Sequence, residues 1–251
     1  MQILHDTLLI FRHQMRLSLR NPVWVVIGLI QPILYLAFFG PLLTGIARSP
    51  GFPTGNAWQV FVPGLLVQLG LFGAAFVGFG IIAEMRMGVL ERMRVTPVSR
   101  LALLLGLMLR DVIVFLTQCL LLLLMAVLFG LRPNPLGLVL ALVFLVLIGL
   151  MMTAYSYAVA LLVKEEGALA ASINALMLPL TLLSGFFLPL TPRWLQVIAL
   201  FNPFAYAVEA ARALFAGNLI SWEVPVGFGL FAVLAAVTMS WAIRAMRQAT
   251  T

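Results

Sequence analysis

Long apolar runs separated by short polar stretches dominate this chain and predict its architecture. A transmembrane helix needs about 20 apolar residues to cross roughly 30 Å of hydrocarbon. Six runs are long enough, so the sequence predicts an all-α, polytopic membrane protein that forms one domain over residues 1–251. The six expected spans cover about residues 23–43, 60–82, 111–131, 137–163, 168–190 and 221–243.

The N-terminal segment, residues 3–20, shows a different pattern. Its apolar residues recur every three or four positions and basic residues flank them, which predicts a helix with one apolar face. Such a helix lies among the lipid headgroups instead of crossing the bilayer. The apolar positions are Leu4, Leu8, Phe11, Met15 and Leu19.

Between the last two spans, residues 191–218 are too few and too polar for two further crossings. Prolines divide this segment, so we expect short re-entrant helices on the external side. Glu209 and Arg212 are three residues apart, a spacing that places them on one helix face as a candidate pair.

Composition and charge fit this picture. The chain is 63% hydrophobic, with a mean hydropathy of +1.13, and its net charge is +7. The basic residues lie at the ends of apolar runs, where anionic lipid headgroups are found, so no nucleic-acid partner is expected. With both termini in the cytoplasm, eleven of the 15 Lys and Arg residues lie on the inner side. We therefore expect a multi-pass protein of the plasma (inner) membrane with this orientation.

Arg110 and Asp111 complicate the third span, because an unpaired charge near mid-bilayer is expensive. We interpret residues 101–110 as a cytoplasmic extension of the third helix that packs on protein. The alternative is a charged position facing the bundle interior. Neighbouring helix residues point about 100° apart, so both side chains would then need partners elsewhere.

Several kinds of catalytic chemistry are missing. Lys164 is the only lysine and lacks the preceding glycines of a Walker A loop. Two histidines and Cys119 cannot supply a zinc site, and no G-x-S-x-G occurs. We expect no catalytic residues, no metal and no bound cofactor, so the chain alone is not an enzyme.

Residues 84–100, EMRMGVLERMRVTPVSR, form the longest charged interruption of the apolar pattern. This stretch resembles the first cytoplasmic loop of ABC-2 type exporter permeases, above all the daunorubicin-resistance type. A second block resembles the C-terminal signature of the same family. It comprises SGFFLP at 184–189, PRWL at 192–195, NPFAY at 202–206 and EAAR at 209–212.

The resemblance implies the membrane subunit of an ABC transporter for drugs, natural products or lipid-like molecules. A separate cytoplasmic ATPase would bind ATP and magnesium, and a second permease chain, identical or homologous, would complete the pathway. Residues 84–96 would form a short helix that docks on the ATPase before Pro97 ends it. The expected coupling residues are Glu84, Arg86, Gly88, Glu91, Arg92, Arg94 and Pro97.

Polar residues inside the spans are few. Tyr155, Ser156, Tyr157 and Asn174 are candidates for the substrate path, with hydrogen bonding between helices as an equally open alternative. The small residues Gly70, Ala74 and Gly78 recur every four positions and predict close approach of another helix.

Three other functions stay open from the residues. A polysaccharide or glycolipid exporter would share the family motifs. A secondary transporter would need charged or broken-helix sites near mid-membrane, and the chain shows no clear internal repeat. A membrane-embedded lipid transferase would need convergent acids, histidines or a metal site, in which the chain is poor.

Overall fold

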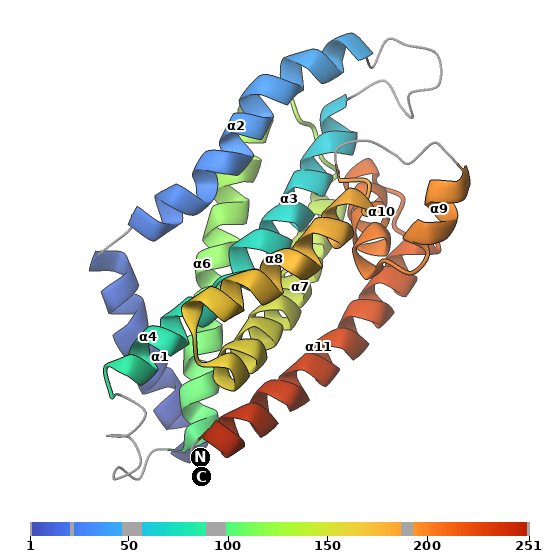
Figure 1. The fold of residues 1–251 in the computed structure, drawn as a ribbon. Helices are drawn as coiled ribbons and strands as arrows, with labels where there is room; N and C mark the ends of the chain where they lie inside the picture. Colours follow the sequence, from blue (N-terminus) through green and yellow to red (C-terminus); the bar gives the residue numbers. More distant parts are fainter. Residues whose placement is uncertain (1, 21–22, 47–56, 89–98, 187–192, 250–251) are drawn as a thin grey trace.

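The computed structural model describes residues 2–20, 23–46, 57–88, 99–186 and 193–249, and all regular structure in these ranges is helical (Figure 1). This confirms the all-α prediction for the described residues. The helices are α1 (Gln2–Arg20), α2 (Val23–Ile46), α3 (Ala57–Ala75), α4 (Gly78–Arg86), α6 (Arg100–Leu128), α7 (Pro135–Val163), α8 (Glu166–Leu182), α9 (Arg193–Ala199), α10 (Pro203–Ala216) and α11 (Glu223–Ala249).

Helix α7 forms the centre of the bundle. It contacts α3, α4, α6, α8, α10 and α11, and more than half of its residues are buried. Its start is well defined, because Asn134 accepts hydrogen bonds from the backbone amides of Leu136 and Gly137 at 3.0 and 3.2 Å. Pro135 follows at the first helical position, where its missing amide hydrogen costs nothing.

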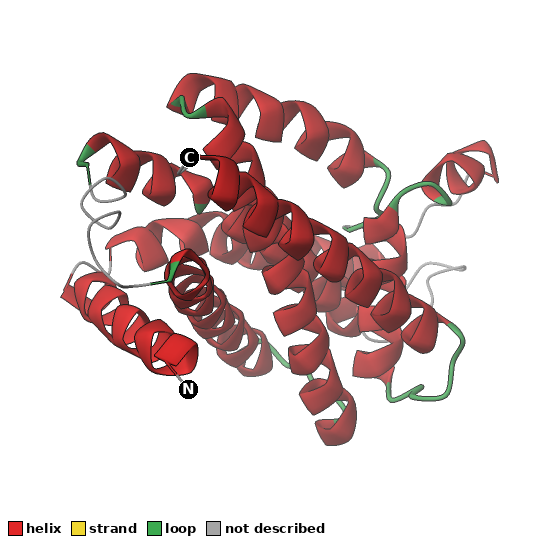
Figure 2. Cartoon of the chain, turned by 90° about the horizontal axis from the view of Figure 1, so that it is seen from below, coloured by secondary structure: helices red, strands yellow, loops and turns green. Residues whose placement is uncertain are grey.

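Both ends of the chain lie at one end of the bundle (Figure 1). The end of α4, the start of α6 and the turn between α7 and α8 lie there as well, whereas α9 and α10 lie towards the other end. Viewed from the end that carries the termini, the described chain is helical throughout, with short connecting loops (Figure 2).

Four helical stretches are long and apolar enough to cross a membrane. They are Trp58–Arg86, Leu101–Leu128, Pro135–Val163 and Glu223–Gln248, while Val26–Phe38 and Glu166–Leu182 are shorter apolar helices. The described residues thus support a polytopic membrane protein. Six crossings remain a prediction.

Two expected spans differ in the structure. The run 60–82 is not one helix, because α3 ends at Ala75 and α4 begins at Gly78. The run 168–190 is helical only to Leu182, and Gly185 has a positive φ of 67°. The expected span 60–82 therefore lies within the apolar helical stretch Trp58–Arg86 but contains a break, whereas the helix expected over 168–190 is shorter than predicted.

The N-terminal helix packs beside the first part of α6. A Cβ on Gly106 would lie 2.8 Å from the Ile10 side chain, so the two helices are in direct contact. Within the predicted apolar stripe, Leu4, Leu8 and Leu19 are 79%, 52% and 72% exposed, whereas Phe11 and Met15 are half-buried. Residues 101–110 therefore pack on protein, as expected, and α1 leaves an apolar face uncovered.

The small-residue stripe contacts helices of the same chain. A Cβ on Gly70 would lie 3.0 Å from Ile148 and 3.1 Å from Phe115, and one on Gly78 would lie 2.7 Å from the Ser156 carbonyl oxygen. Ala74 between them is buried. The predicted close approach is confirmed, and its partner is chiefly α7.

Gly64→Ala is expected to destabilise the fold strongly. An added Cβ would collide with the backbone carbonyl of Phe186, which cannot move aside as a flexible side chain would. Gly73→Ala is the matched control in the same helix, since its nearest neighbour would lie at 3.6 Å. Thermal unfolding in detergent measures both, and equal melting temperatures would contradict this packing.

Candidate functional site

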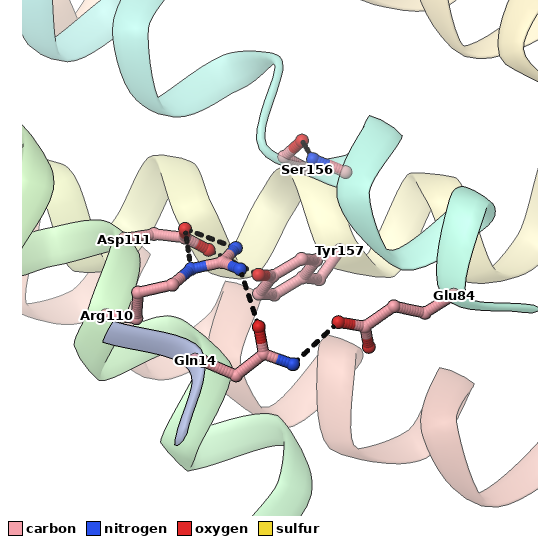
Figure 3. A network of polar contacts seen from close by, with 7 residues as sticks. Gln14, Glu84, Arg110, Asp111, Ser156 and Tyr157 are labelled. Carbon is pink, nitrogen blue, oxygen red and sulfur yellow. Dashed lines mark hydrogen bonds and ion pairs between the residues drawn. The ribbon is translucent and has the colours of Figure 1, made fainter. Parts of the chain in front are cut away.

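A chain of polar side chains links four helices at the end of the bundle that holds the termini (Figure 3). Gln14 of α1 donates from Nε2 to Glu84 Oε1 of α4 at 2.8 Å. Its amide oxygen accepts from Arg110 Nη1 of α6 at 3.3 Å. Arg110 contacts Asp111, and Asp111 accepts a hydrogen bond from the Tyr157 hydroxyl of α7. We call these five residues the polar network.

The charged pair at the centre of the network is buried. Arg110 donates from Nε to Asp111 Oδ1 at 2.8 Å, and its Nη2 lies 2.6 Å from the same oxygen. The side chains are 16% and 7% exposed. The long arginine side chain bends back to its neighbour, and each residue also has the expected partner on another helix, Gln14 for Arg110 and Tyr157 for Asp111. Tyr157 satisfies the second carboxylate oxygen.

Glu84 connects this network to the segment that follows α4. Its Oε2 is buried, with no hydrogen-bond partner among the described residues, while Oε1 accepts from Gln14. Arg86, two residues later, forms an ion pair of 2.8 Å with Glu166 at the start of α8. The end of α4 is therefore tied to both α1 and α8.

The predicted coupling helix from 84 to 96 is wrong at its start. Helix α4 ends at Arg86, and the amide of Gly88 donates to the carbonyl of Met85 at 3.0 Å. Gly88 has a φ of 69°, a left-handed conformation that strains other residues. Helix α4 therefore ends before Gly88, and no continuous helix runs from Glu84 through Gly88. Glu91, Arg92, Arg94 and Pro97 lie outside the described residues.

The four substrate-path candidates do not converge. The ring of Tyr155 packs against that of Trp241 on α11, with 5.9 Å between the ring centroids. Ser156 contacts the junction of α3 and α4, and Tyr157 donates a hydrogen bond to Asp111 on α6. Asn174 is exposed on α8. Successive helix positions point about 100° apart, so the three neighbours face three different helices. For Ser156 and Tyr157 the structure shows hydrogen bonding between helices.

Arg212 makes contacts that the sequence does not predict. It donates from Nε to the Val60 carbonyl at 2.9 Å and from Nη2 to the Gly185 and Phe186 carbonyls at 2.8 and 3.3 Å. It therefore binds backbone groups of α3 and of the segment after α8, and no ion pair with Glu209 is formed. Burial lowers the pKa of Arg212 to about 10, which leaves it charged at neutral pH.

Glu209 is exposed on α10. Burial of part of its carboxyl group raises its pKa, the nearby Glu223 carboxylate acts in the same direction, and Arg212 opposes both. Glu209 and Arg212 therefore lie close enough to interact, as their i, i+3 spacing predicts, but they do not form an ion pair.

Comparison with known proteins decides the family. Residues 5–216 match the model of the ABC-2 type transporter family. The chain belongs to this family. The permease is 28% identical over 226 residues to the daunorubicin resistance ABC transporter permease protein DrrB1 of Streptomyces coeruleorubidus, covering 87% of this chain and 79% of that one. It is 31% identical over 207 residues to ycf38 of Cyanophora paradoxa, whose name describes a transport permease. That match covers 81% of this chain and 71% of the relative.

Two contacts of the site involve residues that sequence reasoning missed. The sequence does not predict the contacts of Gln14, because an amide side chain on an amphipathic helix carries no information about its partner. A weak signal existed: Thr7, Ile10 and Gln14 recur at spacings of three and four, which marks a second face of α1. Glu166 carries a comparable signal, since it opens a helix next to the turn at Lys164.

The geometry of the site is that of a polar link between helices. The described residues include no group of three His, Cys, Asp or Glu side chains that could hold a metal ion. Hydrogen bonds and a buried ion pair join α1, α4, α6 and α7 at this site. Because these contacts connect α4 to α6 and α7, a displacement of α4 would also displace side chains of those helices.

Proposed function

We propose that this chain is the transmembrane subunit of an ATP-driven exporter that moves a hydrophobic or amphipathic compound out of the cytoplasm or the inner leaflet. The family match over residues 5–216 carries the proposal. The relative named for daunorubicin resistance supports a drug or natural product as cargo. A separate cytoplasmic ATPase supplies the energy by binding ATP and magnesium.

The working unit in this proposal has two permease chains, identical or homologous, each with six spans and its termini in the cytoplasm of a plasma (inner) membrane. Exposed apolar faces support burial in lipid or against a second chain: Val233 and Val237 of α11 are 62% and 57% exposed. Native mass spectrometry of the active complex tests the stoichiometry. A complex with one permease chain would contradict it.

The cargo class is tested by export into membrane vesicles that contain the permease and its ATPase. A cationic amphiphile and a lipid-linked glycan are supplied in parallel. We expect ATP-dependent accumulation of the amphiphile. Transport of the glycan alone would favour the polysaccharide alternative, and transport without the ATPase would point to a secondary transporter.

The end of α4 and the segment between α4 and α6 are the proposed ATPase contact, with Glu84, Arg86, Gly88, Glu91, Arg92, Arg94 and Pro97 as coupling residues. The end of α4 and the start of α6, which precede and follow this segment, lie at the end of the bundle that holds the termini (Figure 1). Arg92 and Arg94 would pair with acidic groups on the ATPase.

Glu91→Arg is expected to abolish coupling while leaving membrane insertion normal. Charge reversal replaces an attraction by a repulsion and costs about 1–3 kcal/mol of docking free energy, the range for hydrogen bonds to charged groups. ATPase copurification and substrate-stimulated ATP turnover measure the effect. Glu91→Gln keeps the size and removes the charge, so its loss should be smaller. A Glu91→Arg complex with its ATPase bound and full turnover would contradict the coupling role.

A further inference from the structure

The junction of α3 and α4 is an interrupted helix whose backbone groups are satisfied by another helix. Across Phe76 and Val77 the backbone bonds join residues three apart, from Phe79 to Phe76 at 3.1 Å and from Gly80 to Val77 at 3.0 Å. The amide of Gly78 and the carbonyl of Ala75 therefore lose their usual partners four residues away.

The hydroxyl of Ser156 on α7 replaces both lost bonds. It accepts from the Gly78 amide at 2.9 Å and donates to the Ala75 carbonyl. Ser156 is fully buried, so water does not compete for these groups. One hydroxyl thus holds the two ends of a broken helix together, and the break persists because α7 supplies it.

The contact between Gly78 of α4 and helix α7 is too close to admit a side chain larger than that of glycine. A Cβ on Gly78 would lie 2.8 Å from Ser156 Oγ and 2.9 Å from the Ala160 side chain. The start of α4 therefore rests directly on α7. Any swing of α4 about the break has to pivot at this contact, because the backbone on either side is regular helix.

The far end of α4 is held by side chains instead of packing alone. Glu84 bonds to Gln14 of α1, and Arg86 pairs with Glu166 of α8, both at 2.8 Å. Arg86 and Glu166 are 59% and 47% exposed, so this second tie is weak and easily exchanged. Helix α4 is therefore fixed at Gly78 by a buried contact, whereas one of the two ties at its far end, from Arg86 to Glu166, is exposed and weak.

We propose that Ser156 is a positioning residue for transport: its hydroxyl fixes the angle between α3 and α4, so that movement of the loop after α4 passes to α3 and α7. This inference rests on the proposed function, because the movement comes from the ATPase. It assigns Ser156 to the coupling path and not to the substrate path.

The test uses the full complex of permease and ATPase in lipid vesicles. Ser156→Ala is expected to lower the number of substrate molecules exported per ATP hydrolysed by roughly fivefold or more, because it leaves two buried backbone groups unpaired. Gly78→Ala disrupts the same contact from α4 while the Ser156 hydroxyl stays in place. It should lower the number of substrate molecules exported per ATP by a similar factor.

Two matched controls separate this contact from general damage. Thr153→Val removes a buried hydroxyl of the same helix that has no hydrogen-bond partner among the described residues. Gly80→Ala adds a methyl group near the break, where the nearest atom would be Arg110 Nη2 at 3.8 Å. Both should keep the wild-type ratio of transport to hydrolysis.

Spin labels report the angle of α4 directly. They are placed at two exposed positions, Met87 directly after α4 and Glu165 directly before α8, in a Cys119→Ala background. A second pair at Glu165 and Arg244 monitors a distance that does not involve α4. We expect the wild-type distance from 87 to 165 to be narrow and to shift with a non-hydrolysable ATP analogue. In Ser156→Ala the distribution should be broad before nucleotide is added, with the control pair unchanged.

Each remaining outcome is decisive. Wild-type coupling and label distances in Ser156→Ala and Gly78→Ala would overturn the inference while leaving the proposed function intact. Equal losses in the two control variants, or failure of Ser156→Ala and Gly78→Ala to reach the membrane, would show a folding contact and overturn it as well. A wild-type complex in which nucleotide neither binds nor shifts the labels would instead overturn the proposed function, and the inference with it.

Discussion

Asp111→Ala is expected to prevent the permease from accumulating as a folded protein. The change leaves the Arg110 guanidinium, 16% exposed, without its carboxylate partner. Breaking a buried ion pair from one side costs about 3–5 kcal/mol, a large share of the 5–15 kcal/mol that typically stabilises a folded protein. The yield of monodisperse protein after detergent extraction and its melting temperature measure the effect.

Two further variants separate charge from hydrogen bonding. Tyr157→Phe removes one donor to the charged Asp111 carboxylate and should cost about 1.5–3 kcal/mol. The double variant Arg110→Leu, Asp111→Leu removes both charges, so folded protein should return, because apolar replacement of a buried pair is often tolerated. The double variant should fold without transporting substrate, because the contacts that join Gln14 to Asp111 through Arg110 are absent. Normal yield and melting temperature for Asp111→Ala would contradict the buried pair.

Apolar length predicts where the helices occur better than where they end. Helix α7 runs over Pro135–Val163 against an expected span of 137–163, because an uninterrupted apolar run follows a clear Asn-Pro start. The ends at Gly88 and Gly185 were missed although both glycines were visible in the sequence. Their positive φ values mark the usual way a helix stops, and weighing that signal would have shortened both predictions.

The break between α3 and α4 could not be predicted. Residues 70–82 contain no proline, and their composition suits a continuous span. What stabilises the break is Ser156, 78 positions from Gly78 along the chain. A local pattern cannot show that a distant hydroxyl will satisfy two backbone groups. The same limit applies to the polar network, whose members come from four helices.

The sequence singles out Glu84 and Tyr157 of the polar network for other roles and does not predict that the five residues contact one another. Glu84 was expected to face a partner protein, and it bonds to Gln14 within the chain. Arg110 and Asp111 were recognised as costly in a membrane, which correctly marked a position that needs special support. The support comes from their mutual ion pair and from Tyr157. Charge in an apolar segment therefore predicted importance, while only the fold shows the partners.

Arg212→Ala is expected to destabilise the opposite end of the bundle. The guanidinium joins α10 to backbone carbonyls of Val60, Gly185 and Phe186, which no neighbouring side chain replaces among the described hydrogen bonds. Loss of these charge-assisted bonds should cost on the order of 3 kcal/mol. By the usual relation for a chain of this length, the melting temperature should fall by roughly 6–12 °C.

The comparison with Arg212→Lys tests whether geometry or charge matters. An ammonium group lacks the planar fork that reaches α3 and the end of α8 together, so lysine should recover less than half of the lost stability. Arg132→Ala is the control, because its exposed side chain lies on the turn before α7 at the same end of the bundle. If Arg212→Lys melts at the wild-type temperature, a positive charge alone is sufficient there. In that case the three carbonyl contacts do not hold α10 in place.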